Sequence, residues 1–454
     1  MGGGLVGLTA ALMLRHHDVA VTLVERRSTT SPQPKARRLH VRSMEIFREL
    51  GLAEVVRDAA RELASHDHMA AGRTLAEAEQ LPLWAPAAAM EVSPELPCLI
   101  AQDILEPVLR DAAIDAGTTV RFDTSLVSFE ERSGEIAADA GDLIRARYLV
   151  AADGAHSDVR GALGIGRSGL GATGRPQISV YFLADLGDVV RGREFNLCQI
   201  EHPDAPGGLA SVDGRRRWVF TTPGSSTERD WPSVLRTALG VPAADLEVLS
   251  VLPWQAEMLV ADRYSAGRVH LAGDAAHVMP PFAASGANTG IADVHNLAWK
   301  LAAVLRGEAA PALLDSYDTE RRPAGWFAAD QSSRRVRDLR GQPDPALAHP
   351  FVLAAGGFQY LAGALVPDSS REPVTTFSPA GRVGTRIPHR WLDQQRTRST
   401  IDLAGPGWAV VTGPVADFLP AGECLLLRPD HVVAWRGTSP AVAAEVLSSL
   451  LRGR

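Results

Sequence analysis

Hydrophobic positions in the first third of the chain follow two alternating periods. Leu5, Leu8, Ala11 and Leu12 recur at helical spacing and predict a helix over 5–16, whereas residues 19–24 form a short β-branched run typical of a buried strand. The same pattern continues along the chain and predicts helices over 41–50, 102–116 and 155–163 and strands near 119–130 and 144–151. Gly51 follows the helix over 41–50 and is expected to end it. Residues 60–100 show no clear period. Alternating strands and helices indicate an α/β fold.

The pattern changes between residues 175 and 255. Apolar and polar residues alternate in Ile178–Leu183, Arg217–Phe220 and Val248–Leu252, and turn residues separate these runs. This predicts a mostly antiparallel β-sheet inserted into the α/β protein. Later segments predict helices at 287–306, 311–339 and 440–451, a Pro- and Gly-rich linker at 340–385, and short strands at 408–412, 424–427 and 432–435.

Composition and charge narrow the class of protein. A chain of 454 residues with 46% apolar residues predicts two or three soluble globular domains. Its net charge of -7 argues against a nucleic-acid partner. We expect no membrane span and no signal peptide, because there is no long apolar run and no cationic leader. Cys98, Cys198 and Cys424 form no CxxC pair, which fits buried thiols in a cytoplasmic protein and excludes a disulfide framework or a zinc cluster.

The first motif is a glycine triplet at the start of the chain. Gly2, Gly4 and Gly7 form G-x-G-x-x-G and open the first predicted helix. Such glycines allow a tight turn and close approach to a pyrophosphate at the helix N-terminus. Glu25 ends the next predicted strand, where a carboxylate binds ribose hydroxyls and repels a 2′-phosphate, and Arg26 beside it is a further cofactor candidate. The motif predicts bound FAD or NAD, with a helix entry that binds no ligand as the alternative.

Only Met1 precedes these glycines, so the strand that leads into such a turn is missing from this sequence. We therefore expect the central sheet to lack its middle member and to lose stability.

Two further motifs consist of a short apolar strand that runs into Asp-Gly or Gly-Asp. Tyr148–Ala152 leads into Asp153-Gly154 and on to Arg160, and Val269–Ala272 leads into Gly273-Asp274. A loop follows the second, from Pro280 to Gly290. Together, in this order, the three motifs resemble the single-component FAD-dependent aromatic monooxygenases typified by para-hydroxybenzoate hydroxylase. The residues of these motifs most resemble those of the branch that hydroxylates aromatic polyketides in antibiotic biosynthesis.

The resemblance implies an activity and its cofactors. FAD is reduced by transient NADPH or NADH, dioxygen gives a flavin hydroperoxide, and hydroxyl is transferred to a phenolic, usually polycyclic substrate. No metal or protein nucleophile is needed, and His270 and His277 lack ligand spacing. Partners would be an aromatic small molecule and dioxygen, with the protein a monomer or homodimer. A Baeyer–Villiger or oxidatively decarboxylating enzyme, a non-catalytic binding protein with a decayed flavin site and an NAD dehydrogenase are alternatives.

The resemblance also implies a domain plan. A Rossmann-like FAD-binding domain would take residues 1–167 and 255–340, with 60–100 contributing to a substrate-binding β domain at 168–254. A linker at 341–385 would lead to a thioredoxin-like C-terminal domain at 386–454, which has no CxxC and so serves packing or subunit contact.

Residue roles carry over position by position. Asp274 would bind the ribityl chain, the amides of Gly286, Ala287 and Asn288 would meet the flavin pyrimidine edge, and Pro280 and Pro281 would line the ring. The remaining implied cofactor contacts are Arg42, Gln102, Asp153, Gly154, Arg160 and Gly273. Arg42 and Gln102 could equally be a solvated helix arginine and a neighbour of a helix N-cap. Candidates to line the substrate pocket are Tyr181, Phe182, Phe195, Trp218, Phe220, Met258 and Phe282, although aromatic strand residues are more often core.

The chain departs from the family pattern at two places. Ala283-Ala284 stands where relatives carry Gly-Gly, and alanine at a position that needs a positive φ would be strained. Lys35 replaces an arginine, which keeps the charge but loses the bidentate fork.

Overall fold

The computed structural model describes residues 1–454 except 83–91, 339–342, 370–375, 414–417 and 454. Its N-terminal part is built on short parallel strands beside helix α1 (Leu5–His16). Strand β1 (Thr22–Val24) pairs in parallel with β6 (Thr119–Arg121), and β10 (Leu149–Ala151) pairs in parallel with β17 (Val269–Leu271). The helix begins and ends at the residues that the hydrophobic spacing predicts.

Met1 and Gly2 lie between these two pairs of strands. The Gly2 amide donates to Val24 O at 2.9 Å, and Met1 O accepts from the Ala152 amide at 2.8 Å. The Met1 amino group donates to Val150 O at 2.7 Å. These backbone contacts of Met1 and Gly2 link β1 to β10, which belong to separate sheets.

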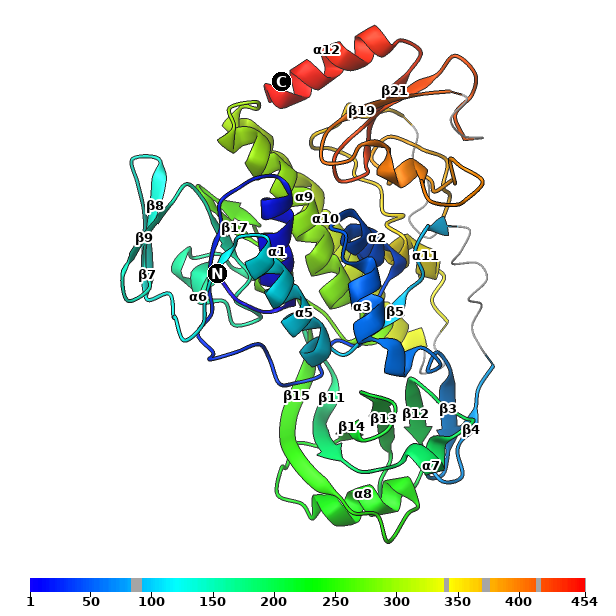
Figure 1. The fold of residues 1–454 in the computed structure, drawn as a ribbon. Coiled ribbons are helices and arrows are strands. Elements are labelled where there is room, and N and C mark those ends of the chain that lie inside the picture. Colours follow the sequence, from blue (N-terminus) through cyan, green and yellow to red (C-terminus); the bar gives the residue numbers. More distant parts are fainter. Residues whose placement is uncertain (83–91, 339–342, 370–375, 414–417, 454) are drawn as a thin grey trace.

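Helix α9 (Ser285–Leu305) runs through the middle of the molecule (Figure 1). It packs against α1 and α10 (Asp315–Asp338), and α5 (Gln102–Asp115) packs on the other side of α1. Val6, Gly273 and Gly290 set the closeness of this packing, because a Cβ at Gly290 would lie 2.6 Å from Val6 Cγ2. The further helices are α2 (Val41–Glu49), α3 (Ala53–Ala59), α6 (Asp158–Ala162), α7 (Gly187–Val190), α8 (Trp231–Leu239), α11 (Pro350–Ala354) and α12 (Pro440–Leu451).

A sheet of eight strands forms a second lobe, at the bottom of Figure 1. Its order is β18-β15-β11-β14-β13-β12-β3-β4, and all neighbours are antiparallel except β12 and β3. The predicted antiparallel segment is confirmed, and residues from the stretch without a clear period join it. The bounds are β3 (Met69–Gly72), β4 (Glu79–Gln80), β11 (Arg167–Leu183), β12 (Leu197–Ile200), β13 (Gly207–Ser211), β14 (Arg217–Pro223), β15 (Glu247–Ala261) and β18 (His277–Val278).

The two faces of this sheet differ. Val180 and Phe182 on β11 pair with Phe220 and Trp218 on β14, and all four side chains pack under α8 in a core of their own. Tyr181 lies on the opposite face, where it packs with Ala101 and Ile104 of the first lobe. Alternation along the strand therefore decides which side chains can face the first lobe.

The C-terminal residues form a third core at the other end of the molecule (Figure 1). Strands β19 (Ala409–Thr412), β20 (Cys424–Leu427) and β21 (Val433–Gly437) make an antiparallel sheet beside α12, close to the predicted positions. The likeness to thioredoxin stays a prediction. A meander that the sequence pattern did not separate is formed by β7 (Ser128–Arg132), β8 (Glu135–Asp139) and β9 (Leu143–Ala146). Short pairs are formed by β2 (Arg38–Leu39) with β5 (Cys98–Leu99) and by β16 (Ser265–Ala266) with β17.

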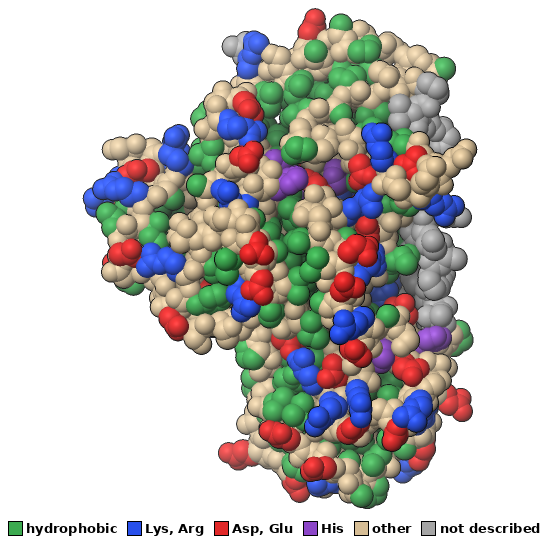
Figure 2. Space-filling view, in the orientation of Figure 1, with side chains coloured by type: hydrophobic (Ala, Val, Ile, Leu, Met, Phe, Trp, Pro, Cys, Tyr) green, Lys and Arg blue, Asp and Glu red, His purple; other side chains and the backbone are tan. Residues whose placement is uncertain are grey.

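The surface carries charges of both signs. Lys and Arg are interspersed with Asp and Glu over the face shown in Figure 2. Among the described residues, no helix is long and apolar enough to cross a bilayer.

Candidate functional site

The glycines at the start of α1 leave no room for side chains. Gly2 has φ +96°, and a Cβ there would lie 2.3 Å from Ala152 O. A Cβ on Gly7 would lie 1.8 Å from Gly2 O. The backbone turn, the strand end and the helix are therefore in direct contact, as a tight phosphate-binding turn requires.

The N-terminus of α1 offers free amides. The N-cap residue Gly4 supplies no side-chain cap, and the first turn has no acidic residue of its own. The Gly3 amide donates to Glu25 at 2.6 Å and the Leu5 amide donates to Glu106 at 2.9 Å. Within the described part of the chain the amides of Gly4 and Val6 make no hydrogen bond, so the helix end can receive an anion. Glu25 is buried at this turn, whereas Arg26 is exposed.

Glu106 is a site residue that sequence reasoning missed. Its carboxylate is fully buried and accepts from the amides of Leu5 and Ser31 and from Gln102 Nε2. Gln102 in turn accepts from the Ala36 amide at 3.2 Å. The spacing of Gln102 and Glu106, one helical turn apart, could have indicated that both face α1.

The Asp-Gly motif is tied to the Gly-Asp loop by an arginine. Asp153 accepts from Ser157 Oγ at 2.6 Å, and Gly154 has φ +87° with open space where a Cβ would lie. Arg160 is buried and donates to Ala275 O at 2.8 Å, next to Asp274. Arg160 therefore fixes the distance between the two motifs.

Asp274 is the carboxylate in the site that has no partner. It is exposed and makes no hydrogen bond or ion pair with any described residue. Enough protein surrounds it that desolvation raises the pKa of its carboxyl. Gly273 before it has φ +61°, and its amide donates to the buried Asp293 at 3.1 Å. The loop is thus anchored while the Asp274 carboxylate stays available to a ligand.

The N-terminus of α9 is a second helix end without a cap. Ala284 at the N-cap has φ 51°, which confirms the expected strain, and it supplies no side-chain hydrogen bond. Ser285 Oγ is buried without a partner among the described residues. The side chain of Asn288 is already hydrogen-bonded within the protein, because its Oδ1 accepts from the His40 amide at 2.8 Å and from Ser43 Oγ at 2.6 Å. The amides of the first turn, including Gly286 and Ala287, are the groups left for a ligand.

Among the described residues, Arg42 directs its hydrogen bonds away from the first turn of α9. Its guanidinium contacts His295, His431, Glu45 and the carbonyl of Asp430, at the junction with the C-terminal core. A cavity of about 90 Å³ adjoins that junction and is lined in part by Arg42, Asn288 and His295. This volume is too small for a dinucleotide or a polycyclic substrate.

Most of the expected pocket residues lie elsewhere. Phe195, Trp218 and Phe220 are 0–2% exposed in the core beneath α8, and Phe182 lies with them. They face away from the first lobe, so the structure does not support their lining a substrate pocket. Met258 is buried in the main core. Phe282, a half-buried residue just before α9, and Tyr181, on the face toward the first lobe, remain candidates.

A polar group around Tyr181 links the sheet to the first lobe. Arg217 Nε donates to Tyr181 Oη at 2.7 Å, and Arg217 also forms an ion pair with Asp103 of α5. On the same strand, Ser179 Oγ accepts from Trp254 Nε1 at 2.9 Å. The alternation of side chains along β11 and β14 could have placed Ser179 and Arg217 on the same face of the sheet as Tyr181. The ion pair between Arg217 and Asp103 could not be predicted in this way, because it depends on how the two lobes pack.

Comparison with known proteins decides the family. A model described as an FAD binding domain matches residues 1–332. The chain belongs to this FAD-binding family of flavoprotein monooxygenases. FAD is therefore its cofactor, and the glycine turn, the two helix ends and Asp274 described above fit that group.

Sequence relatives match this chain over almost its whole length. The chain is 38% identical over 538 aligned residues to tetracenomycin A2 monooxygenase-dioxygenase of Streptomyces glaucescens, and the alignment covers 99% of this chain and 95% of that protein. It is 35% identical over 486 residues to aklavinone 12-hydroxylase DnrF of Streptomyces peucetius, covering 99% and 96%.

Solved structures agree with this assignment. The flavin-dependent monooxygenase PieE in complex with FAD and substrate superposes with a TM-score of 0.87 at 27% identity, over 100% of this chain and 98% of that one. Aklavinone-11 hydroxylase in a ternary complex with FAD and aklavinone gives a TM-score of 0.84 at 28% identity, over 99% and 97%. The mixed α/β fold is that of FAD-dependent monooxygenases.

Proposed function

We propose that this monooxygenase uses NADPH or NADH and dioxygen to hydroxylate a polycyclic phenol of the aromatic polyketide class. One observation carries the proposal. Three groups belong to elements that pack on one another through Val6, Gly273 and Gly290. They are the free amides of Gly4 and Val6 at the start of α1, the uncapped N-terminus of α9, and the Asp274 carboxylate, which has no partner among the described residues. The polyketide substrate class is supported by the printed activities of the relatives that match along the whole chain.

Each group has a part in holding FAD. The turn at Gly2, Gly4 and Gly7 would hold the pyrophosphate, and Glu25 the adenosine ribose. Asp274 would accept from the ribityl hydroxyls, while the first amides of α9 would meet the pyrimidine edge. When bound, FAD supplies the electron transfer and the oxygen activation.

The positive end of α9 has an electrostatic role at this edge. No acidic residue in its first turn and no side-chain cap neutralises the helix dipole. Such an end stabilises negative charge that develops at the pyrimidine edge on reduction. Pro280 and Pro281, before the helix, would line the ring.

Tyr181 is suited to orient a phenolic substrate. Because an arginine side chain only donates, Tyr181 Oη accepts from Arg217 and keeps its own proton for another acceptor. The described residues offer no such acceptor. A substrate oxygen between the sheet and the flavin would be one, and the ion pair of Arg217 with Asp103 holds the donor in place.

The domain plan belongs to this proposal. An FAD-binding domain at 1–167 and 255–340 and a substrate domain at 168–254 are supported by the separate core beneath α8. The C-terminal core supports a further domain from 386. A cytoplasmic location and a monomeric or homodimeric state complete the proposal.

The test is flavin binding and substrate-stimulated reduction. We expect purified protein to bind FAD, and NADPH to reduce it anaerobically far faster when a true polycyclic phenol is present. Asp274→Ala removes acceptors of charge-assisted hydrogen bonds, so we expect FAD affinity to fall roughly 10- to 100-fold. FAD titration followed by flavin fluorescence measures this.

Asp262→Asn is the matched control, because the exposed carboxylate of Asp262, just after β15, accepts from Ser168 Oγ. Its FAD affinity should equal that of the wild type. Protein that binds no FAD contradicts the proposal. Protein that binds FAD but inserts oxygen beside a ring ketone of the substrate to give a lactone, by mass spectrometry and NMR of the product, would establish the Baeyer–Villiger alternative instead of hydroxylation.

A further inference from the structure

Helix α2 connects the first turn of α9 to the C-terminal residues. Near its start, the His40 amide and Ser43 Oγ donate to Asn288 of α9. Two other side chains of α2 contact the C-terminal residues instead. Glu45 accepts from Arg386 at 2.9 Å, and Arg42 contacts His431. One short helix therefore contacts both the flavin-facing end of α9 and the C-terminal core.

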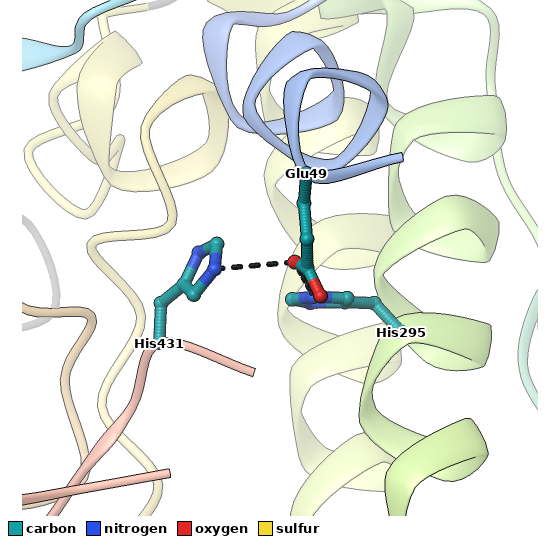
Figure 3. Close-up of side chains that lie close together, drawn as sticks. All are labelled: Glu49, His295 and His431. Atoms are coloured by element: carbon teal, nitrogen blue, oxygen red, sulfur yellow. Dashed lines mark hydrogen bonds and ion pairs between the residues drawn. The ribbon is translucent and has the colours of Figure 1, made fainter. Parts of the chain in front are cut away.

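Figure 3 shows the centre of this junction, where Glu49 of α2 lies between His295 of α9 and His431. Glu49 Oε2 lies 2.8 Å from His295 Nε2 and 3.2 Å from His431 Nε2. On their other sides, His295 Nδ1 and His431 Nδ1 lie 3.1 Å and 2.7 Å from the guanidinium of Arg42. Both imidazoles are thus placed between one arginine and one carboxylate.

The chemistry of Arg42 determines the tautomer of both imidazoles. A guanidinium has only donors, so each Nδ1 must accept and carry no proton. Each neutral ring then carries its proton on Nε2 and donates it to Glu49. Burial raises the pKa of Glu49, but the imidazole neighbours outweigh it and hold that pKa well below its ordinary value, so Glu49 is ionised.

The same argument disfavours a metal ion at this cluster. The ligand atoms of Glu49, His295 and His431 lie within 4.8 Å of one another, close enough for one ion. A metal-bound histidine, however, uses the Nε2 lone pair and donates from Nδ1–H to an acceptor. Here Nδ1–H would face the N–H groups of Arg42.

A second set of buried charges fixes the next residue of α9. Asn296 Nδ2 donates to Asp430 Oδ2 at 3.0 Å and to Glu320 of α10 at 2.7 Å. Arg428 donates to Glu320 at 2.8 Å and is fully buried. Buried charges tolerate little displacement, because a lost partner leaves an uncompensated charge. The segment 428–431 therefore meets two successive residues of α9, because Asp430 bonds Asn296 and the His431 ring lies 5.2 Å from the His295 ring.

We propose that the segment 428–431 is a positioning element for the flavin-facing end of α9, with His431 acting through Arg42 and α2 on Asn288. This inference rests on the proposed function, since it needs FAD at the first turn of α9. The path is continuous: His431 to Arg42, along α2 to Ser43, and from Ser43 to Asn288. Networks of this kind transmit coupling where a packed element has a defined arrangement.

Two substitutions at His431 test the path in the full chain. His431→Ala removes the acceptor for Arg42, and we expect FAD to bind about 2- to 30-fold more weakly with a shifted flavin absorption spectrum. His431→Asn places an amide oxygen where Nδ1 lies and should restore both readouts. Asparagine also suits this backbone, because His431 has φ 63°. Flavin fluorescence titration and absorption spectra measure the outcome.

His389→Ala is the matched control. His389 is also buried in the C-terminal core, but its ring bonds Ser399 and not α2 or α9. Circular dichroism melts should show comparable losses of stability for His389→Ala and His431→Ala, with FAD affinity reduced only in the latter. If His431→Ala does not fold, Ser43→Ala interrupts the same path and should reproduce the spectral shift.

Other results overturn the inference. Equal FAD affinity and spectra in wild type, His431→Ala and Ser43→Ala would show that α9 is positioned without the C-terminal segment. A calorimetric Zn²⁺ site that His431→Ala abolishes would overturn the tautomer assignment. Wild-type protein without FAD affinity would instead refute the proposed function, which separates the two failures.

Discussion

At the scale of single residues, the backbone is strained at Ala284, the N-cap of α9. Ala284 has φ 51° at the start of α9, a conformation that favours glycine. We predict that Ala284→Gly raises the free energy of unfolding by about 1 kcal/mol, because it relieves this strain. Ala292→Gly, in the interior of the same helix, should lower it by about 1 kcal/mol. Urea denaturation measures both, and equal signs would show that Ala284 is unstrained.

A buried histidine makes stability depend on pH. Burial lowers the pKa of His270 to about 4, and within the described part of the chain its ring hydrogen-bonds Ser265 alone. Since the pKa in the folded state lies below the unfolded value, its contribution is present above about pH 6.5 and is lost as pH falls toward 4. At pH 5 the loss is roughly 2 kcal/mol.

The prediction is a difference between two proteins. Urea denaturation at pH 7 and pH 5 should show a smaller acid-induced loss in His270→Gln than in wild type, because glutamine does not titrate. The other buried histidines contribute equally to both proteins. An identical pH dependence would mean that His270 is protonated in the folded state.

At the scale of elements, the two faces of strands β11 and β14 are expected to contribute differently, one to stability and the other to substrate binding. Phe220 faces the core under α8, and Tyr181 faces the first lobe. We predict that Phe220→Ala costs about 3–5 kcal/mol of stability and leaves substrate stimulation of flavin reduction intact in the folded fraction. Tyr181→Phe should cost at most about 1 kcal/mol and weaken that stimulation. Urea denaturation and anaerobic stopped-flow reduction distinguish the two, and the reverse pattern would place the substrate on the α8 side.

At the scale of the whole molecule, buried charges dock the C-terminal core onto α9 and α10. Burial alone would raise the pKa of Glu320, but Arg428 and Lys300 beside it lower that pKa to about 2. Arg428→Ala would remove the guanidinium that pairs with both Glu320 and Asp430. We predict a loss of about 3–5 kcal/mol.

Arg436→Ala is the control within the same sheet. Arg436 pairs with Glu423 near the surface, so its loss should cost at most about 1 kcal/mol. Thermal melts followed by circular dichroism compare the two variants. A similar small loss in both would mean that the C-terminal core docks through apolar contacts alone.

The sequence predicted the structure correctly where interactions between neighbouring residues decide it. The periodicity that predicts a helix over 5–16 depends on neighbouring turns of one helix, and α1 has those bounds. Gly51 ends α2 with φ +71°, as its place after the helix predicts. The three motifs, in their order along the chain, led to the FAD-binding family because each encodes a backbone shape that few other residues permit.

Local physics did not decide which aromatic residues line a pocket. Alternation shows that Tyr181 and Phe182 lie on opposite faces, but not which face α8 covers. Glu106 and Asp103 were missed for the same reason, since their partners come from elements far along the chain.

The sequence by itself therefore determined the family, the cofactor and the backbone turns at the proposed cofactor site, because these depend on short-range geometry. Only the tertiary structure decided that Arg42 contacts the C-terminal junction and that Phe195, Trp218 and Phe220 form a separate core. It also decided that Asp274 has no partner among the described residues. Such choices depend on which distant charges and apolar faces meet when the lobes pack, and no local pattern contains that information.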